Sequence, residues 1–292
     1  MHANANMNQT ASHIVKSLAA LPPLPAAAAE ILAQFGDEFI EARTVTQIVE
    51  RDPGICAKLL GLANSAFFNL AEPVTRMEEV ISRVLGVDTV RSLVFAMALQ
   101  KSFDHTRCPA FDPQKFWLDS LCVAESCKRL ARSDDNASES LVNLSYPAGL
   151  CHNLGLMALA HIEAERTDRV LQAHADYPRP CGLAPRLVEE FNTDHRHTTA
   201  ELAKLWSLPE VIVSAYEHRT SSAADGAENH LAAMLDASVA TIGNRTGPDE
   251  SWVDLDGTAR RLGLTADQLT ELAEPNDRQL DRLRSVASSM KA

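Results

Sequence analysis

Apolar residues recur every three or four positions along most of the chain, which is the spacing of one face of an α-helix. In the segment 54–67, for example, Ile55, Leu59 and Leu62 fall on one face. Runs of alternating apolar and polar residues rich in Val, Ile and Thr are nearly absent, which argues against a sheet. The pattern therefore predicts an all-α protein.

Proline, glycine and capping residues mark where the predicted helices begin and end. The prolines of Leu21-Pro-Pro-Leu-Pro25 delay the first strong helix until residue 26. Thr44 is expected to cap a short helix, which Asp52-Pro53 ends. The predicted helix 87–101 is apolar nearly all round, so we expect it to be central and buried. The full set of predicted helices is 26–35, 44–50, 54–67, 77–85, 87–101, 114–132, 139–161 with a bend at Pro147, 166–175, 184–191, 194–206, 210–218, 229–243, 255–262, 265–272 and a last helix from 277.

The segment 104–113, which contains two prolines, is the clearest internal linker, and it divides the predicted helices into two lobes. Several of these helices are too short to be stable alone, so tertiary packing must hold them. The predicted organisation is a flexible tail over 1–13, a domain over 14–218 with an N-terminal lobe 14–103 and a second lobe 112–218, and a helical extension of the second lobe over 219–292.

The net charge of −12 restricts the classes of partner. A nucleic-acid-binding protein needs a clustered excess of Lys and Arg, which is absent, so a basic protein surface is the better match. The longest apolar run, Leu93–Leu99, is too short to span a membrane, and the polar N-terminus has no signal-peptide core. The six cysteines form no CxxC pair, which indicates reduced, mostly buried thiols. These features predict a cytoplasmic protein that binds neither nucleic acid nor a membrane.

Short motifs follow one another in a recognisable order. The first half contains Ile48-Val-Glu-Arg-Asp52-Pro53 and, after an apolar helix, Asn64-Ser65-Ala66-Phe67-Phe68. The second half contains Phe116-Trp117, Ala148-Gly-Leu-Cys-His152-Asn153-Leu-Gly155, Asp194-His195 and Trp206-Ser-Leu-Pro209. In these motifs, from about residue 15 to about residue 245, the chain closely resembles the HDOD family, the non-catalytic relatives of HD-domain metal phosphohydrolases. The second lobe is then expected to be HD-like.

The Asn64-Ser65 pair has a structural interpretation as well as a functional one. Short polar side chains near a helix end can bond to freed backbone carbonyls and so end the helix. Phe67 and Phe68 are then expected to pack the N-terminal lobe. We give this structural interpretation more weight than a ligand-binding role.

The resemblance implies where a metal site would lie. HD phosphohydrolases hold a divalent ion with a histidine, an adjacent His-Asp pair and a later aspartate, because such an ion acidifies a bound water. In this chain Asp119 stands where the first histidine would fall, the pair is His152-Asn153, His195 matches a family histidine, a single His218 replaces the usual His-His, and Asp236 corresponds to the last aspartate. These six residues form the predicted binding site.

Loss of the first histidine and of the paired aspartate removes an imidazole and a carboxylate, so we expect no catalytic residue, no metal ligand and no cofactor. The resemblance implies a bacterial signal-transduction module that acts by binding a protein or a small ligand, with a partner in a cyclic-di-GMP-linked or two-component pathway. The alternatives are a residual metal-dependent nucleotide phosphohydrolase or phosphodiesterase, metal binding without turnover, and a transcription-related factor, which the acidic charge disfavours. The oligomeric state is left open.

Overall fold

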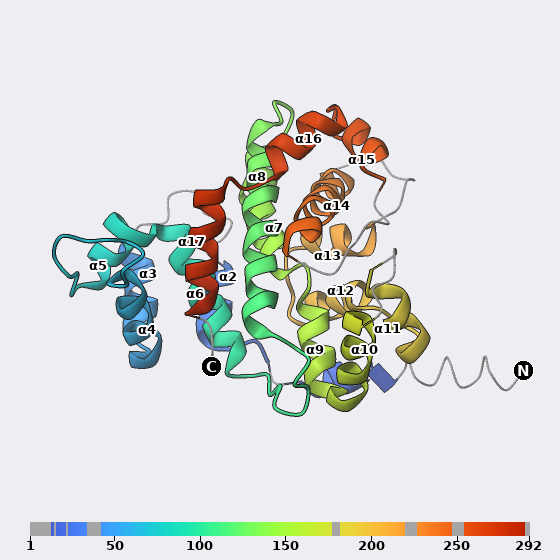
Figure 1. Ribbon diagram of the computed structural model, residues 1–292, viewed down its shortest axis with the longest axis horizontal. Helices are drawn as coiled ribbons and strands as arrows, with labels where there is room; N and C mark the ends of the chain where they lie inside the picture. Colours follow the sequence, from blue (N-terminus) through green and yellow to red (C-terminus); the bar gives the residue numbers. More distant parts are fainter. Residues whose placement is uncertain are drawn as a thin grey trace, which may run out of the picture. The chain divides into compact units, whose positions relative to one another are not determined.

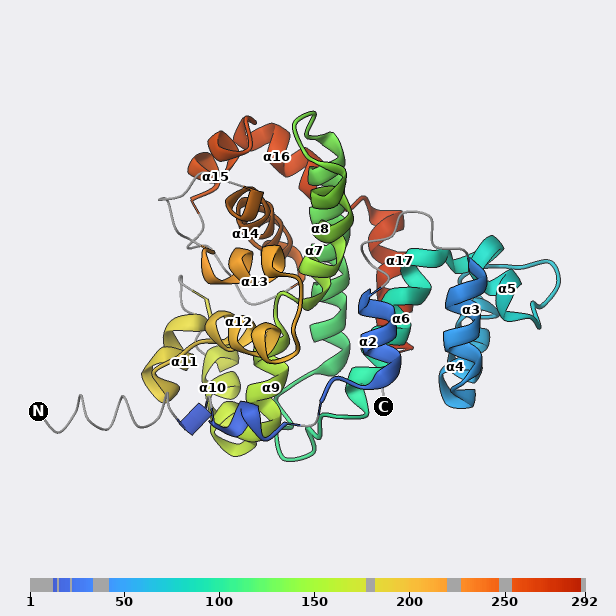
Figure 2. The same cartoon turned by 180° about the vertical axis from the view of Figure 1, so that it is seen from behind.

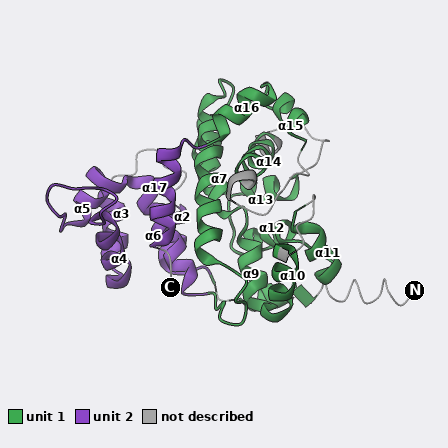
Figure 3. Ribbon diagram, in the orientation of Figure 1, with its two compact units in different colours: residues 1–23, 103–274 green, residues 24–102, 275–292 purple. Residues whose placement is uncertain are grey.

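The computed structural model describes residues 13–14, 16–21, 23–33, 42–176, 182–219, 227–246 and 254–289. Within these ranges every regular element is a helix, so the predicted all-α fold is confirmed (Figure 1). The chain divides into two compact units (Figure 3). Unit 1 comprises residues 1–23 and 103–274, and unit 2 comprises residues 24–102 and 275–292.

Unit 2 is built from two segments that are far apart in the sequence. Its helices are α2 (Ala26–Ala33), α3 (Ala42–Glu50), α4 (Pro53–Ala63), α5 (Met77–Glu79), the π-helix η1 (Val80–Leu85), α6 (Val87–Gln100) and α17 (Asp277–Ser288). Residues 90–99 of α6 are all buried, as its apolar sequence predicts. The last helix, α17, belongs to this unit, whereas the sequence suggested a C-terminal extension of the second lobe.

Local chemistry explains where α4 begins. Asp52 is its N-cap, and its carboxylate accepts hydrogen bonds from the backbone N–H groups of Gly54 at 3.0 Å and Ile55 at 3.1 Å. Pro53 occupies the first turn, where a missing N–H costs nothing. Thr44, by contrast, lies inside α3 rather than at its cap, because α3 already begins at Ala42.

Asn64 ends α4 and closes the loop that follows. Its side-chain Nδ2 donates to the carbonyls of Leu60 at 3.0 Å and Val74 at 2.8 Å, and its Oδ1 accepts from the Val74 N–H at 2.8 Å. The predicted role of Asn64 in helix termination is confirmed. The Ser65 hydroxyl, in contrast, makes no hydrogen bond within the described part of the chain.

The expectation that Phe67 packs the lobe is wrong. Phe67 is 43% exposed, and its ring meets the Phe68 ring edge-on, with centroids 5.1 Å apart. The physical reason is that α4 stops at Ala63, four residues earlier than the predicted end. Phe67 therefore lies in the loop closed by Asn64 and not on the apolar face of a longer helix.

The predicted single helix 77–85 is an α-helical turn followed by a π-helix. In the π-helix η1 the chain winds more widely, and the N–H of Gly86 bonds to the carbonyl of Ile81 at 3.0 Å. Gly86 then adopts a φ of +84°, a left-handed conformation that glycine tolerates best. This turn starts α6.

Unit 1 holds the helices between residues 113 and 273, seen from both sides in Figures 1 and 2. They are α7 (Pro113–Ser133), α8 (Glu139–Cys151), α9 (Leu154–Ile162), α10 (Ala164–Asp176), α11 (Ala184–Phe191), α12 (His195–Leu205), α13 (Glu210–Glu217), α14 (Ala227–Thr246), α15 (Leu255–Arg261) and α16 (Ala266–Ala273). Among the described residues, no helix combines the length and apolar character needed to cross a membrane.

The predicted helix 139–161 breaks at a different place from the expected bend. Pro147 sits inside α8, which continues to Cys151, and the break falls at His152 and Asn153. The Nδ1 of His152 lies 2.8 Å from the carbonyl oxygen of Gly149, and Asn153 leaves the helical conformation at φ −120° and ψ 15°. The motif that carries the candidate residues is thus a helix-to-helix corner.

Candidate functional site

Two glycines let the helices around this corner approach closely. A Cβ on Gly149 of α8 would lie 2.5 Å from the Cα of Ala124 in α7, and a Cβ on Gly155 of α9 would lie 2.1 Å from the carbonyl oxygen of His195 in α12. The N–H of Gly155 also donates to the Thr199 hydroxyl at 2.8 Å. These contacts position His152 and Asn153, which lie between the two glycines in the sequence.

The six predicted site residues all lie in unit 1, each on a different helix or at its end. Asp119 is in α7, His152 follows α8, Asn153 precedes α9, His195 begins α12, His218 follows α13 and Asp236 is in α14. Three of them, His152, His195 and Asp236, are buried, and the other three are half-buried. Their convergence on one binding point stays a prediction.

His152 and His218 both turn towards backbone. The Nδ1 of His152 pairs with the backbone carbonyl of Gly149, three residues earlier. His218 turns back on α13, with its Nδ1 2.7 Å from the carbonyl oxygen of Ser214 and 3.2 Å from the Ser214 hydroxyl. The buried Oδ1 of Asn153 has no hydrogen-bond partner among the described residues.

Asp236 is paired with a cation of the chain itself. The Arg219 Nε donates to its Oδ1 at 2.9 Å, and both side chains are only 2% exposed. Sequence inspection missed Arg219, although a signal was present: Asp236 sits in a fully apolar helix face, where a buried carboxylate needs a positive partner.

The surroundings of this ion pair are unreactive. Cys127 donates from its thiol to the Ser238 hydroxyl at 3.3 Å, and burial raises its pKa to about 12, so the reactive thiolate is absent at neutral pH. Tyr216, which sequence inspection also missed, donates from its hydroxyl to the Ala148 carbonyl at 2.7 Å and ties α13 to α8. These contacts join α7 to α14 and α13 to α8.

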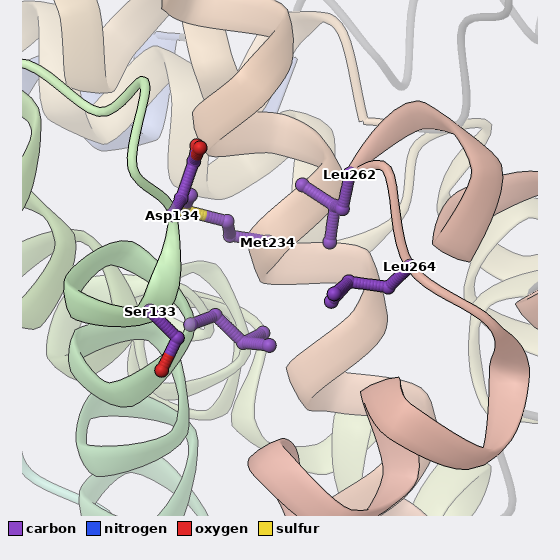
Figure 4. A pocket seen from close by; sticks show the side chains of 6 residues that line it. Ser133, Asp134, Met234, Leu262 and Leu264 are labelled. Carbon is purple, nitrogen blue, oxygen red and sulfur yellow. The ribbon is translucent and has the colours of Figure 1, made fainter.

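Met234 of α14 lines a small pocket (Figure 4). Its lining residues are Leu130, Ser133, Asp134, Met234, Leu262 and Leu264. The Asp134 carboxylate is bonded to the His230 imidazole, and most of the other lining side chains are apolar. None of the six predicted site residues lines this pocket.

Asp194 anchors the start of α12. Its Oδ1 accepts from the backbone N–H groups of Arg196 at 3.0 Å and His197 at 2.9 Å, and the Arg196 guanidinium pairs with its Oδ2. Burial by itself would raise the pKa of this carboxyl, but the His197 hydrogen bond and the charges of His195 and Arg196 outweigh it and hold the pKa well below its ordinary value. Asp194 is therefore ionised throughout the physiological range.

The Asp194–His197 pair is expected to make the free energy of unfolding depend on pH near and above the ordinary pKa of histidine. The hydrogen bond to Asp194 raises the pKa of His197 above its ordinary 6.5. The imidazolium contribution is therefore complete below pH 6.5 and is lost as the pH rises through the raised pKa, whereas the carboxylate contribution is lost only in strong acid. We expect His197→Gln to lower the free energy of urea unfolding most below pH 6.5, and progressively less as the pH rises through the raised pKa of His197. His161→Gln serves as the control, and an equal loss at every pH would contradict the assignment.

Comparison with known protein families shows to which family this chain belongs. The HDOD domain model matches residues 21–222, more than half of the chain. The chain belongs to the HDOD family. No curated protein matches the sequence. The glycine-bounded corner described above is thus part of an HDOD domain.

Solved structures share the HDOD fold. A protein from Marinobacter aquaeolei VT8, named for signal transduction, aligns with a TM-score of 0.79 at 24% identity over 98% of this chain, which spans 66% of that protein. An HDOD domain protein from Geobacter sulfurreducens aligns with a TM-score of 0.66 at 20% identity over 93% of each chain. A protein from Shewanella amazonensis SB2B, named as a candidate phosphohydrolase, aligns with a TM-score of 0.64 at 23% identity over 95% of this chain and 98% of its own.

The HD phosphohydrolases related to the HDOD family hold a divalent metal ion. The described residues at the corresponding positions of this chain do not fit such an ion. The Asp236 carboxylate is bonded to Arg219, whose positive charge stands beside the oxygen that an ion would need. Among the described residues, no group of three His, Cys, Asp or Glu side chains is arranged to hold a metal ion.

Proposed function

We propose that this HDOD protein is a regulatory module that acts by binding a protein partner and does not hydrolyse phosphate esters. The observation that carries the proposal is the buried ion pair between Arg219 and Asp236. A metal ion in this position would acidify a bound water, whereas a guanidinium neutralises the carboxylate without offering an open coordination position. The scaffold is then retained for its shape and surface.

Membership of the HDOD family and the Marinobacter protein named for signal transduction support a regulatory role. The net charge of −12 favours a basic surface on the partner, with an association that weakens as salt rises. We place the partner in a cyclic-di-GMP-linked or two-component pathway, as the family resemblance implies. We place the protein in the cytoplasm, since its five described cysteines are free thiols; Cys181 lies outside the described residues.

The catalytic alternative, a residual metal-dependent phosphohydrolase, is tested with the full chain purified without chelator. We expect no stoichiometric Mn, Fe, Zn or Mg by elemental analysis and no turnover of a phosphodiester reporter above the His152→Ala variant. His152→Ala is the matched control because it removes one candidate ligand. Stoichiometric metal together with turnover that disappears in His152→Ala would overturn the proposal.

Partner binding is tested with the tagged full chain as bait in native lysate. We expect a specific protein, identified by mass spectrometry and purified, to bind the bait again in isolation, with an affinity that falls between low and high salt. The absence of any partner that binds again in isolation would contradict the proposal.

A further inference from the structure

The loop between α6 and α7 is fastened to α9 and α10 of unit 1. We call residues 103–111 of this loop the strap (Figure 1). Near its start, the Asp104 N–H donates to the Nδ1 of His161 in α9 at 3.0 Å. Near its end, the Ala110 N–H donates to the Oδ1 of Asp168 in α10 at 2.7 Å. The strap is thus held at both ends by its backbone.

Aromatic rings surround the middle of the strap. The ring of His105 is parallel to that of Phe103, with centroids 6.3 Å apart, and its centroid is 4.6 Å from that of Phe111. The Phe103 ring in turn meets the rings of His161 and Trp206 edge-on, at 5.7 and 6.2 Å. The imidazole of His105 is therefore packed as one ring of an aromatic cluster.

His105 has lost its bonds to water without gaining others. Both of its ring nitrogens are buried, and neither forms a hydrogen bond within the described part of the chain. A charged imidazolium in this position would lose its hydration as well. Burial first, and then the positive charge of His161, lower the pKa of His105 from 6.5 to about 4, while the Asp104 carboxylate acts in the opposite direction. The fastened strap therefore holds His105 neutral.

The titratable groups of the strap itself keep their charge states between pH 7 and pH 5. The Asp104 carboxylate accepts from the N–H and the hydroxyl of Thr106, at 2.9 and 2.7 Å, which lowers its pKa. The hydrogen bond from Arg107 likewise lowers the pKa of Glu165 in α10. Burial raises the pKa of the Cys108 thiol to about 11, so it stays neutral.

Two further groups face the strap from α9 and α10. The Nδ1 of His161 lies 3.0 Å from the nitrogen and 3.2 Å from the carbonyl oxygen of Asp104. A neutral ring accepts from the N–H and a charged ring can donate to the carbonyl, so this contact survives protonation. Asp168, which holds Ala110, also accepts from the Nε2 of Gln172 at 2.7 Å. His105 is then the group whose protonation conflicts with its surroundings.

We propose that the strap is released by acid, and that a proton taken up by His105 detaches residues 103–111 from α9 and α10. In water the imidazole has the ordinary pKa of 6.5, so the released strap binds a proton more tightly than the fastened strap. The fastened strap is therefore favoured most above pH 6.5 and progressively less as the pH falls towards 4. Between pH 7.5 and pH 5 the ratio of released to fastened strap is expected to rise about thirtyfold.

Release changes what the domain presents to solvent. The side chains of Phe103 and Phe111, each 6% exposed in the fastened strap, then become accessible. Helices α6 and α7 are then joined by an unattached segment. This change of conformation requires a proton and no partner, so the inference stands or falls separately from the proposed function.

Hydrogen exchange of the full chain, followed by mass spectrometry, tests the release. After correction for the intrinsic pH dependence of exchange, the protection of the strap is expected to fall about thirtyfold from pH 7.5 to pH 5. Residues 154–160 of α9, which are all buried, are the internal reference and are expected to keep their protection. No fall in the strap, or an equal fall in the reference, would overturn the proposal.

The variant His105→Phe decides whether the imidazole is the cause. A phenyl ring preserves the packing and takes up no proton, so the strap is expected to be equally protected at pH 5 and pH 7.5. If this variant does not fold, His105→Leu replaces it. Arg107→Gln is the matched control, because it removes the exposed ion pair to Glu165 and is expected to leave the fall unchanged. A fall that persists in the His105 variant, or that disappears in Arg107→Gln, would overturn the assignment.

Discussion

Replacing Gly155 by alanine is expected to lower the free energy of unfolding by about 3 kcal/mol or more. The added Cβ would stand 2.1 Å from the carbonyl oxygen of His195 and 2.5 Å from the backbone nitrogen of Thr199. Both are backbone atoms, so α9 and α12 would have to move apart and the hydrogen bond from the Gly155 N–H would be lost. Urea unfolding followed by circular dichroism measures the effect.

Gly61→Ala is the matched control for this prediction. Gly61 lies in α4 on the exposed side, and nothing lies within 4 Å of its added Cβ. Alanine there is expected to stabilise the chain by about 0.5–1 kcal/mol, because glycine is a poor helix former. If Gly155→Ala and Gly61→Ala lowered the free energy of unfolding by similar amounts, the close contact of α9 with α12 would not be the cause of the effect.

The second large effect is expected from Arg219→Met, which should cost about 3–5 kcal/mol of unfolding free energy. The substitution leaves the Asp236 carboxylate buried without the guanidinium that donates to it at 2.9 Å. Most of the lost free energy comes from leaving the buried Asp236 carboxylate without a partner, and less from losing the attraction between the two charges.

The double variant Arg219→Met with Asp236→Leu tests that reason. With both charges removed, stability is expected to return to within about 1–2 kcal/mol of the natural chain. If the double variant were as unstable as Arg219→Met alone, the cost would lie in lost packing around the arginine stem and not in the unpaired carboxylate.

Much of the fold follows from local sequence. Apolar spacing predicts the helices, and the Asp52-Pro53 step marks the start of α4 because a capping carboxylate and a proline act within one turn. The break at His152 and Asn153 could not be predicted in the same way. It depends on a local contact, in which the His152 side chain reaches the Gly149 carbonyl, and on a tertiary one, in which Gly155 packs against α12.

The candidate site was predicted only in part for a related reason. A search for metal ligands selects His, Asp and Asn, and it passes over Arg219 because arginine is not a ligand. The partner of Arg219 lies 17 residues further along, in α14, whereas Arg219 lies in the turn after α13, so spacing within one helix could not connect them. The exposure of Phe67 escaped prediction because the end of α4 depends on Asn64 bonding to Val74, ten residues away.

The two-segment construction of unit 2 has a consequence for synthesis. The ribosome makes residues 24–102 before residues 103–274 of unit 1, and residues 275–292 of unit 2 follow. Unit 2 therefore stays incomplete, and open to aggregation, while most of unit 1 is being made. A stop codon just before residue 275 would accordingly damage the unit whose first helices are encoded before most of unit 1.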